Sequence, residues 1–176
     1  MEPPTLAGLG GFLLYKVYFM KRIPLSQGKF ALVDDEDFEE LKKYRWYATC
    51  PKNIFYAYRS FILNGNRVKR SMHCKIIHKV DGLIIDHIDG DGLNNQRSNL
   101  RLCTNAENQR NSKKFRNNTT GYRGVYKMKH SNRFESKICV DGKRIYLGGF
   151  STKEEAYKAF CDAAKTYHKE FASTRL

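Results

Sequence analysis

The sequence lacks paired cysteines. Its five cysteines are an odd number, they are widely spaced, and no two form a C-x-x-C motif. Structural zinc sites and disulfide frameworks use closely spaced or evenly numbered cysteines. The pattern therefore argues against a structural zinc site and favours a reducing compartment, such as the cytoplasm. The cysteines are Cys50, Cys74, Cys103, Cys139 and Cys161.

A long apolar run is also missing. Residues 8–19 are apolar, but Lys16 interrupts them and no basic region precedes them. A transmembrane helix needs about 20 apolar residues, and a signal peptide begins with a basic segment. We therefore expect neither, and no membrane partner. Because Met20-Lys21-Arg22 resembles an ordinary start, residues 1–19 are expected to be a dispensable extension.

Acidic residues are scarce: 18 Asp and Glu stand against 32 Lys and Arg, for a net charge of +14. Lys and Arg that neutralise phosphates release counterions on binding, so this balance favours nucleic acid as partner. The alternative is a soluble protein that is basic without binding nucleic acid. The excess is greatest at residues 113–176, with 15 cations against 6 acids.

Polar chemistry is densest at residues 84–111. Ile84 to His87 predicts a short buried strand, and Leu100 to Cys103 predicts a return strand after a loop rich in Gly, Asn and Asp. Thr104 to Glu107 fits a capping box that starts a helix. This order places Asp86 and His87 at the mouth of the loop and Asn108 on the first turns of the helix, where the three can meet.

These three side chains suit phosphodiester hydrolysis. A neutral His87 can take a proton from water. The Asp86 carboxylate and the Asn108 amide oxygen are hard ligands for Mg²⁺ or Mn²⁺, which keeps several waters and binds substrate oxygens. Neighbours on a strand point to opposite faces, so the strand must end or bulge here, as Gly90 and Gly92 allow. A purely structural Asp–His pair is the alternative.

The pattern D-H-I-D-G-D-G-L-N-N-x-x-x-N-L-R-x-x-T-x-x-x-N at residues 86–108 resembles the HNH homing endonucleases, in the branch that ends in Asn. The resemblance implies that His87 is the general base and that Asp86 and Asn108 hold the metal. It also implies that Asn99 is the central Asn that braces the loop. Members of the family cleave DNA, and the protein is expected in the cytoplasm of a bacterial or phage-infected cell.

Residues 20–80 carry mixed signals and are expected to be a β-rich segment with short helices. The expected elements are a strand at 29–33, a helix at 35–43, a strand at 46–48, a hairpin of 55–63 and 67–71, and a helix at 72–78. Aromatic side chains alternate with cations in the hairpin, which fits either a DNA-facing surface or an aromatic core. HNH relatives often have His-Arg where this chain has His73-Cys74, and we take His73 as structural.

The C-terminal region reads as a separate module after a basic linker at 113–120. Strands are expected at 122–127, 134–140 and 143–150, and Thr152 with Glu155 fits a capping box that starts a helix. Ile138, Ile145 and Leu147 should face that helix. The opposite face of the sheet would then be free to enter a DNA groove, as in other β-sheet readers.

Residues 121–176 resemble the APETALA2/ethylene-response-factor DNA-binding domain. The resemblance is carried by the segments Y-R-G-V-Y, G-K-R-I-Y-L-G-G-F and E-E-A-Y-K-A-F-C-D-A-A. The family often has Arg where this chain has Tyr126 and Cys139, so its base preference does not carry over. Matching positions that would touch DNA are Arg123, Lys137, Arg144 and Tyr146, with Tyr126 and Lys127 as weaker candidates.

The sequence thus predicts an α+β protein with a central ββα-metal motif at 81–112, an N-terminal β-rich segment at 20–80 and a C-terminal three-stranded sheet plus helix. The expected function is metal-dependent endonuclease action on double-stranded DNA. A monomer is expected, for which nicking of one strand is reasonable, and both double-strand cleavage and a dimer stay open. The rival from another class is a DNA-binding regulator without activity, and an RNA-binding module is a third possibility.

Overall fold

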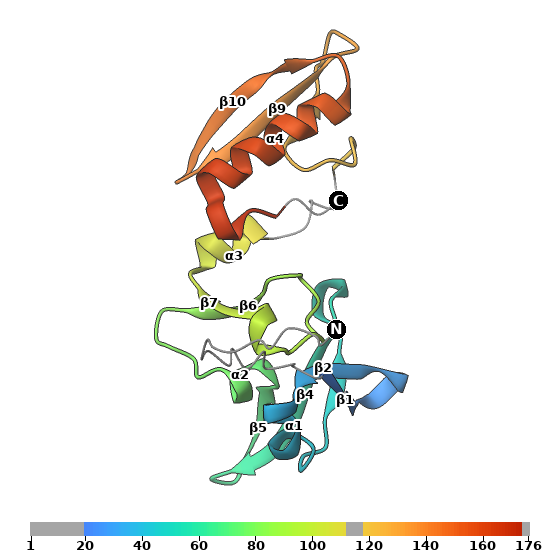
Figure 1. Cartoon of the computed structure of the whole chain (residues 1–176), viewed down its shortest axis with the longest axis vertical. Coiled ribbons are helices and arrows are strands. Elements are labelled where there is room, and N and C mark those ends of the chain that lie inside the picture. The colour runs from blue at the N-terminus through green and yellow to red at the C-terminus, as the bar shows by residue number, and fades with distance from the viewer. Residues whose placement is uncertain (1–19, 112–117, 174–176) are drawn as a thin grey trace, which may run out of the picture.

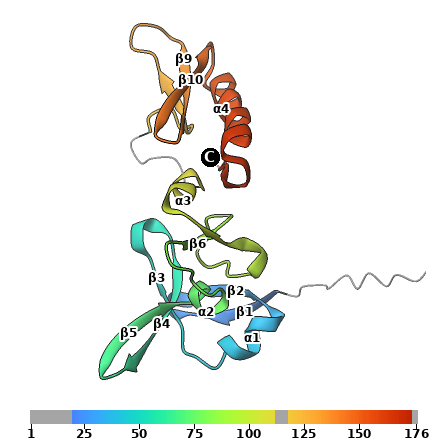
Figure 2. The ribbon, with the colours of Figure 1, turned by 90° about the vertical axis from the view of Figure 1, so that its left-hand side faces the viewer.

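The computed structural model describes residues 20–111 and 118–173, and it shows an elongated molecule (Figure 1). Two units lie one after the other along the long axis, and helix α3 (Asn105–Asn111) lies between them (Figure 2). The described residues form a mixed α/β fold with four small antiparallel sheets and four α-helices. The expected extension at 1–19 and most of the expected linker lie outside the described residues.

The N-terminal unit contains three two- or three-stranded sheets and two short helices. Its first elements are β1 (Met20–Pro24), β2 (Phe30–Asp34), α1 (Asp35–Leu41) and β3 (Tyr47–Thr49). The next are β4 (Tyr56–Leu63), β5 (Asn66–Ser71), α2 (His73–Ile76), β6 (Ile84–His87) and β7 (Leu100–Cys103). β1 pairs with β2, β6 pairs with β7, and the third sheet has the order β3-β4-β5.

One core joins the segment 20–80 to the loop and strands that follow it. Val33, Trp46 and Met72 are buried together with Leu100 of β7, and Leu93 packs against them. The loop after β6 is also tied to β2, because Leu32 N donates to Leu93 O at 2.9 Å. The polar stretch is therefore held on the N-terminal segment by main-chain hydrogen bonds as well as by apolar packing.

The sequence predicted most of these elements within one or two residues, but it missed β1. That strand pairs along its whole length with β2, yet only Ile23 among its five residues is buried. A strand with one buried position has no apolar alternation to detect. The predicted hairpin and the strands β6 and β7 are confirmed.

The C-terminal unit is a three-stranded sheet covered on one face by a helix. β8 (Val125–Lys127), β9 (Phe134–Val140) and β10 (Lys143–Phe150) have the order β10-β9-β8, and α4 (Lys153–His168) packs on them through Ala156, Phe160 and Ala164. The predicted capping box is present, with Thr152 accepting from Glu155 N at 3.2 Å. Ile138 lies buried under α4, as expected.

The first strand of this sheet is shorter than predicted. It begins at Val125 because the preceding residues form a turn, in which Asn118 Nδ2 donates to Tyr122 O at 2.7 Å and Thr120 Oγ1 donates to Val125 O at 3.0 Å. Gly124 has a positive φ, and a Cβ there would lie 2.1 Å from the Phe160 ring. The end of the expected linker, residues 118–120, thus belongs to the module.

No helix in residues 20–111 or 118–173 is long and apolar enough to cross a membrane.

Candidate active site

Strands β6 and β7 and helix α3 form one continuous unit around the predicted site. His87 is the last residue of β6, paired with Leu100, and the chain turns at once because Gly90 N donates to His87 O at 2.9 Å. Gly90 has φ +71°, a conformation that glycine adopts without strain. The strand end that an Asp86–His87 site requires is therefore present. Thr104 and Glu107 cap α3 by reciprocal hydrogen bonds.

Asp86 is buried, and its carboxylate is bound on one side only. Oδ2 accepts from Arg101 Nε at 3.0 Å, from Arg101 Nη2 at 2.8 Å and from Asn111 Nδ2 at 2.8 Å. None of these bonds reaches Oδ1. The guanidinium compensates the buried negative charge, and it holds the carboxylate in one orientation.

His87 is buried against two other rings. The His73 ring lies 5.0 Å away and the Tyr56 ring 5.7 Å away, both centroid to centroid and edge to face. Nε2 of His87 has no hydrogen-bond partner among the described residues. An unpaired buried nitrogen of this kind is uncommon, since buried polar atoms normally find partners, and it points to a functional atom.

Burial sets the protonation of both histidines. It lowers the pKa of His87, against the opposing effect of Asn95 and of the nearby carboxylates. Burial and the neighbouring His87 lower the pKa of His73 to about 4. Both rings are thus neutral at pH 7, which is the form in which His87 accepts a proton. His73, expected to be only structural, touches the candidate base.

The loop between β6 and β7 is braced by Asn99. Its Oδ1 accepts from Asp89 N at 3.0 Å, and its Nδ2 donates to Asp89 Oδ1 at 2.9 Å and to Asn94 O at 2.8 Å. Burial raises the pKa of Asp89, but hydrogen bonds from Asp91 N, Asn94 and Asn99 outweigh this and lower it. The Asp89 carboxylate is therefore charged and committed to the loop.

Two asparagines of α3 face the site. Asn111, which the sequence reasoning missed, donates through Nδ2 to Asp86 Oδ2 and, at 3.0 Å, to His87 O. Asn108 lies three residues earlier, and residues three apart are neighbours on one helix face. Asn108 is therefore on the face of α3 that turns to Asp86. That spacing within N-A-E-N-Q-R-N was the signal available in the sequence.

The far end of the loop is anchored to α1 by a second network. Arg97 makes a bidentate pair with Asp37 at 2.7 and 2.8 Å, and Arg97 N donates to Asp34 Oδ2 at 2.8 Å. Gln96 Nε2 donates to the other oxygen of Asp34 at 3.0 Å. These contacts join residues about 60 positions apart, so no local pattern announces them.

The oxygen atoms near His87 suit a hard divalent cation. No cluster of three His, Cys, Asp or Glu that would hold a metal occurs in the described ranges. Mg²⁺ needs no such cluster, because it binds through one or two protein oxygens and keeps its waters. Asp86, whose Oδ1 takes none of the hydrogen bonds above, and Asn108, on the same face of α3 as Asn111, are the residues that would supply such oxygens.

Four of the six predicted DNA-contacting residues share one face of the C-terminal sheet. Tyr126, Lys137, Arg144 and Tyr146 lie opposite α4, and the two tyrosines are 47% and 57% exposed. Lys137 pairs with Glu135 at 2.5 Å.

The other two lie elsewhere. Lys127 is exposed at the end of β8, but it alternates to the side of Val125. Arg123 donates to Arg110 O at 2.7 Å and to Gln109 O at 3.1 Å. Its guanidinium therefore joins the module to α3 and is not displayed on the sheet face. Lys127 and Arg123 thus lie apart from the sheet face that the other four share, and DNA contact by all six stays a prediction.

Comparison with known proteins gives a family match for the central stretch. Residues 79–110 match the family model described as HNH endonuclease. This match covers β6, β7 and most of α3. The central stretch is therefore similar to HNH endonucleases.

Two viral proteins are similar to longer parts of the chain. The "Uncharacterized HNH endonuclease L560" of Acanthamoeba polyphaga mimivirus is 27% identical over 164 residues, which cover 92% of this chain and 83% of that protein. "Protein 3.8" of Escherichia phage T7 is 38% identical over 63 residues, which cover 36% of this chain and 52% of that protein. The match to the phage protein thus spans about half of its length.

Proposed function

We propose that the protein is a metal-dependent endonuclease of the HNH homing type that hydrolyses phosphodiester bonds in duplex DNA. The carrying observation is the unpartnered Nε2 of the buried His87, set beside the Asp86 carboxylate, whose Oδ1 takes none of the hydrogen bonds described above. Both lie in the segment that matches the HNH endonuclease family. The strand, strand and helix around them form the ββα-metal arrangement in this proposal.

His87 acts as the general base. Its ring is neutral at pH 7 because burial lowers its pKa, so Nε2 takes a proton from the attacking water. Tyr56 and His73 fix the plane of the ring from two sides. General base action of this kind contributes typically about 10²–10⁴-fold to a rate.

Asp86 and Asn108 would hold Mg²⁺ or Mn²⁺ through Oδ1 and the amide oxygen. When bound, the cation stabilises the charge that develops on the phosphate and on the leaving 3′ oxygen, which gives 5′-phosphate and 3′-hydroxyl products. Arg101 and Asn111 orient the carboxylate by binding its other oxygen. Asn99 keeps the loop closed around His87 by its bonds to Asp89 and Asn94.

The C-terminal sheet grips the duplex in this proposal. Tyr126, Lys137, Arg144 and Tyr146 form an exposed face of aromatic and cationic side chains. A sheet face or ribbon of this kind fits the major groove, where it can contact phosphates and base edges. The resemblance to the APETALA2 domain supports the same use of this face.

The test is incubation of the full chain with mixed phage or bacterial DNA, with Mg²⁺ or with EDTA. We expect strand cleavage with the metal only. Asn108→Ala should raise the Mg²⁺ concentration needed, whereas Asn105→Ala, an exposed position at the start of the same helix, should not. Tight DNA binding with no cleavage under any metal would support the inactive regulator, and tighter binding of RNA than of duplex DNA would support the RNA-binding module.

A further inference from the structure

Strands β4 and β5 form a ribbon that leaves the body of the N-terminal unit. β3 pairs only with Tyr56 to Tyr58, so the five pairs from Arg59–Arg70 to Leu63–Asn66 have no third strand beside them. The ribbon projects at the end of the molecule far from the C-terminal unit (Figures 1 and 2). Its main chain is thus presented on an extended, two-stranded arm.

The arm has an unbalanced positive charge. Residues 51–80 contain seven Lys and Arg and no Asp or Glu. Arg67, Lys69 and Arg70 are exposed on β5, and no carboxylate pairs with them in the described part of the chain. Just after α1, by contrast, Lys42 and Lys43 pair with Glu39 and Glu40 of that helix at 2.6 and 2.7 Å.

Two arginines even lie directly opposite each other across the ribbon. Arg59 pairs in register with Arg70, an arrangement that is destabilising for like charges. The Arg59 guanidinium lies 3.8 Å from the Tyr44 ring centroid and 4.8 Å from that of Phe61, contacts that offset part of this cost. A polyanion beside the ribbon would relieve the remaining repulsion.

The tip of the ribbon is apolar and exposed. Ile62 is 64% and Leu63 is 51% exposed, next to the turn at Asn64 and Gly65. Neither side chain belongs to the buried core. A two-stranded ribbon fits the major groove, and apolar side chains at a tip are suited to contact base edges such as the thymine methyl group.

The ribbon also lies at a useful distance from the site. β4 starts at Tyr56, whose ring touches His87, and it runs outward for eight residues. At roughly 3.3 Å per residue the tip lies about 23 Å from Tyr56. At about 3.4 Å per base pair this is roughly 7 base pairs. The ribbon and the C-terminal sheet lie at opposite ends of the long axis, with the site between them (Figure 1).

We propose that the β4–β5 ribbon is a second contact surface for duplex DNA. Arg67 and Lys69 on one face of the ribbon and Arg70 on the other contact phosphates on the two sides of the groove, and Ile62 and Leu63 at the tip enter the groove. The choice of ligand rests on the proposed function. With the C-terminal sheet, the ribbon holds the duplex on both sides of the cleaved bond.

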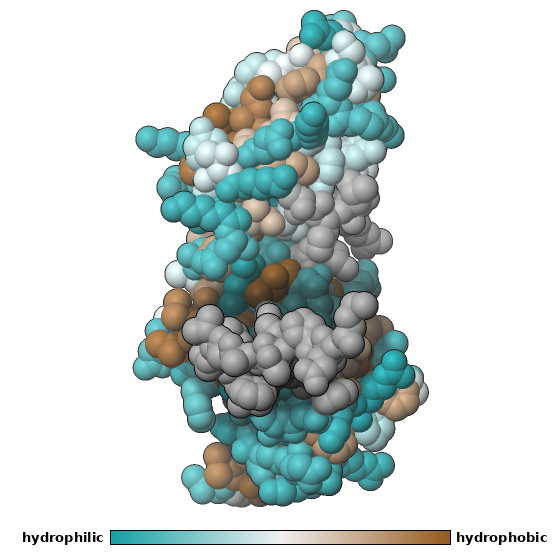
Figure 3. All heavy atoms as spheres, in the orientation of Figure 1, coloured by the Kyte–Doolittle hydropathy of each residue, from teal (hydrophilic) through white to brown (hydrophobic). Residues whose placement is uncertain are grey.

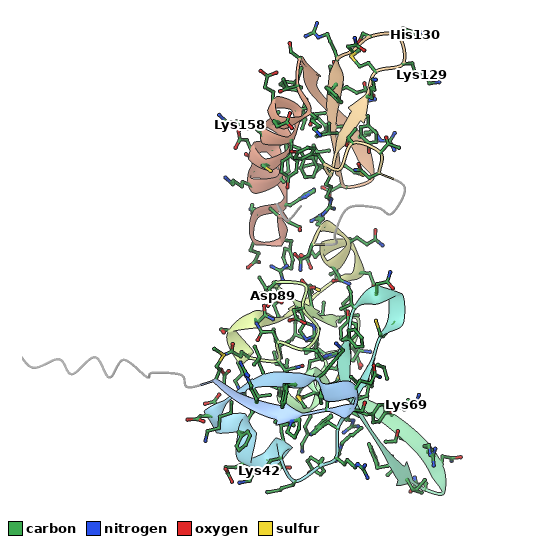
Figure 4. All side chains as sticks on the ribbon, turned by 90° about the vertical axis from the view of Figure 1, so that its right-hand side faces the viewer. Lys42, Lys69, Asp89, Lys129, His130 and Lys158 are labelled. Carbon is green, nitrogen blue, oxygen red and sulfur yellow. The ribbon has the colours of Figure 1, made fainter. Side chains whose placement is uncertain are left out.

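Salt dependence of binding tests the cationic part. The full chain is titrated with a fluorescent duplex in EDTA at several KCl concentrations. The slope of log K against log salt is negative, and each lost phosphate contact should make it shallower by about 0.9. Arg67→Ala/Lys69→Ala should therefore make the slope shallower by about 2. Lys42→Ala/Lys43→Ala removes the same charge just after α1, where Lys42 lies away from Lys69 (Figure 4), and should leave the slope unchanged. Equal slopes in the two double variants would overturn the proposal.

The apolar tip has a separate signature. Ile62→Ser/Leu63→Ser should weaken binding several-fold with no change in slope, because apolar contacts release no counterions. An unchanged affinity would show that Ile62 and Leu63 are not part of the DNA contact surface. An RNA duplex of the same sequence should compete weakly, since its major groove is too narrow for the ribbon. Competition as strong as that of DNA would contradict a groove-binding ribbon.

These outcomes are independent of cleavage. If the wild-type chain binds DNA but never cuts it, the proposed nuclease fails and the ribbon is still tested by its slope. If the wild type cuts and the ribbon variant keeps the wild-type slope, the ribbon alone fails. Far-ultraviolet circular dichroism and urea unfolding of each variant show whether its fold is intact.

Discussion

The central site and the C-terminal sheet differ in the exposure of their functional side chains. Asp86 and His87 are 7% and 4% exposed, whereas Tyr126 and Tyr146 on the sheet are 47% and 57% exposed. Among the described residues of the site, most polar atoms are used by a neighbour, and the buried atoms without a hydrogen-bond partner include His87 Nε2 and Asn95 Oδ1. On the sheet the polar groups meet water.

Figure 3 shows the hydropathy of one face of the molecule. Hydrophilic side chains cover much of the visible face of both units, and apolar side chains show between them and in patches. A reaction centre needs few groups held in fixed positions, while a gripping surface needs many groups that can exchange water for phosphate. In the proposed function, DNA cleavage and DNA affinity therefore depend on different parts of the molecule.

The two regions are nevertheless joined by arginines. Arg101 binds Asp86 through Nε and Nη2, and through Nη1 it donates to Glu170 O at 2.5 Å, while its guanidinium lies 4.1 Å from the Phe171 ring centroid. Arg110 pairs with Asp141 at 2.7 Å. The side chain that orients the candidate metal ligand thus also touches the C-terminal unit.

Arg101→Ala should have the largest effect on stability. It leaves a buried Asp86 without its counter-charge and removes the contact with the C-terminal unit, and breaking such a pair costs about 3–5 kcal/mol. Urea unfolding at pH 7 measures the loss. Lys21→Ala, which breaks an exposed pair with Asp35, is the control and should cost under about 1 kcal/mol. Equal losses in both variants would contradict the account of Arg101.

Acid should destabilise the central site more than the C-terminal sheet. The folded pKa of His73, about 4, lies below the usual 6.5, so the unfolded chain binds more protons between these values. Stability is therefore full above about pH 6.5 and falls as the pH is lowered, by roughly 3 kcal/mol from His73 once the pH is near 4. His87 acts in the same direction.

Urea unfolding of the wild type and of His73→Gln between pH 4.5 and 7.5 measures this dependence. The variant should lose stability less steeply as the pH falls, with the remaining slope due in part to His87. If stability depended on pH equally steeply in the wild type and in His73→Gln, His73 would not be buried in its neutral form.

The two capping boxes give the smallest and most symmetrical comparison. Thr104→Ala and Thr152→Ala each remove an N-cap hydrogen bond, at 3.3 and 3.2 Å, and each should cost about 1 kcal/mol. Only Thr104→Ala should also slow cleavage, because α3 carries Asn108 and Asn111. Cleavage assays at saturating protein compare the two, and an equal slowing in both variants would link α4 to the chemistry.

Local patterns in the sequence were sufficient for much of this structure. The alternation in F-E-S-K-I-C-V, the Asp-Gly turn after it and the two Thr-x-x-Glu words mark elements through neighbours within a few residues. The spacing from Asp86 to Asn108 likewise follows from one loop, one strand and one helical turn.

Contacts between distant residues were out of reach. The pairs Arg97–Asp37 and Arg101–Glu170 join residues 60 and 69 positions apart, and each depends on how finished elements pack. Arg123 is an example: its sequence context predicted DNA contact, and no local pattern indicated its hydrogen bonds to the main chain of α3. Tyr56 was missed for the same reason, whereas Asn111 had a local signal in its spacing of three residues from Asn108.

Single-turnover cleavage by His87→Ala, at protein concentrations that saturate the DNA, tests the central claim most directly. The account predicts a rate lower by about 10²–10⁴-fold with DNA affinity in EDTA unchanged. His78→Ala, an exposed histidine, should match the wild type in both. Cleavage by His87→Ala at the wild-type rate would contradict the account.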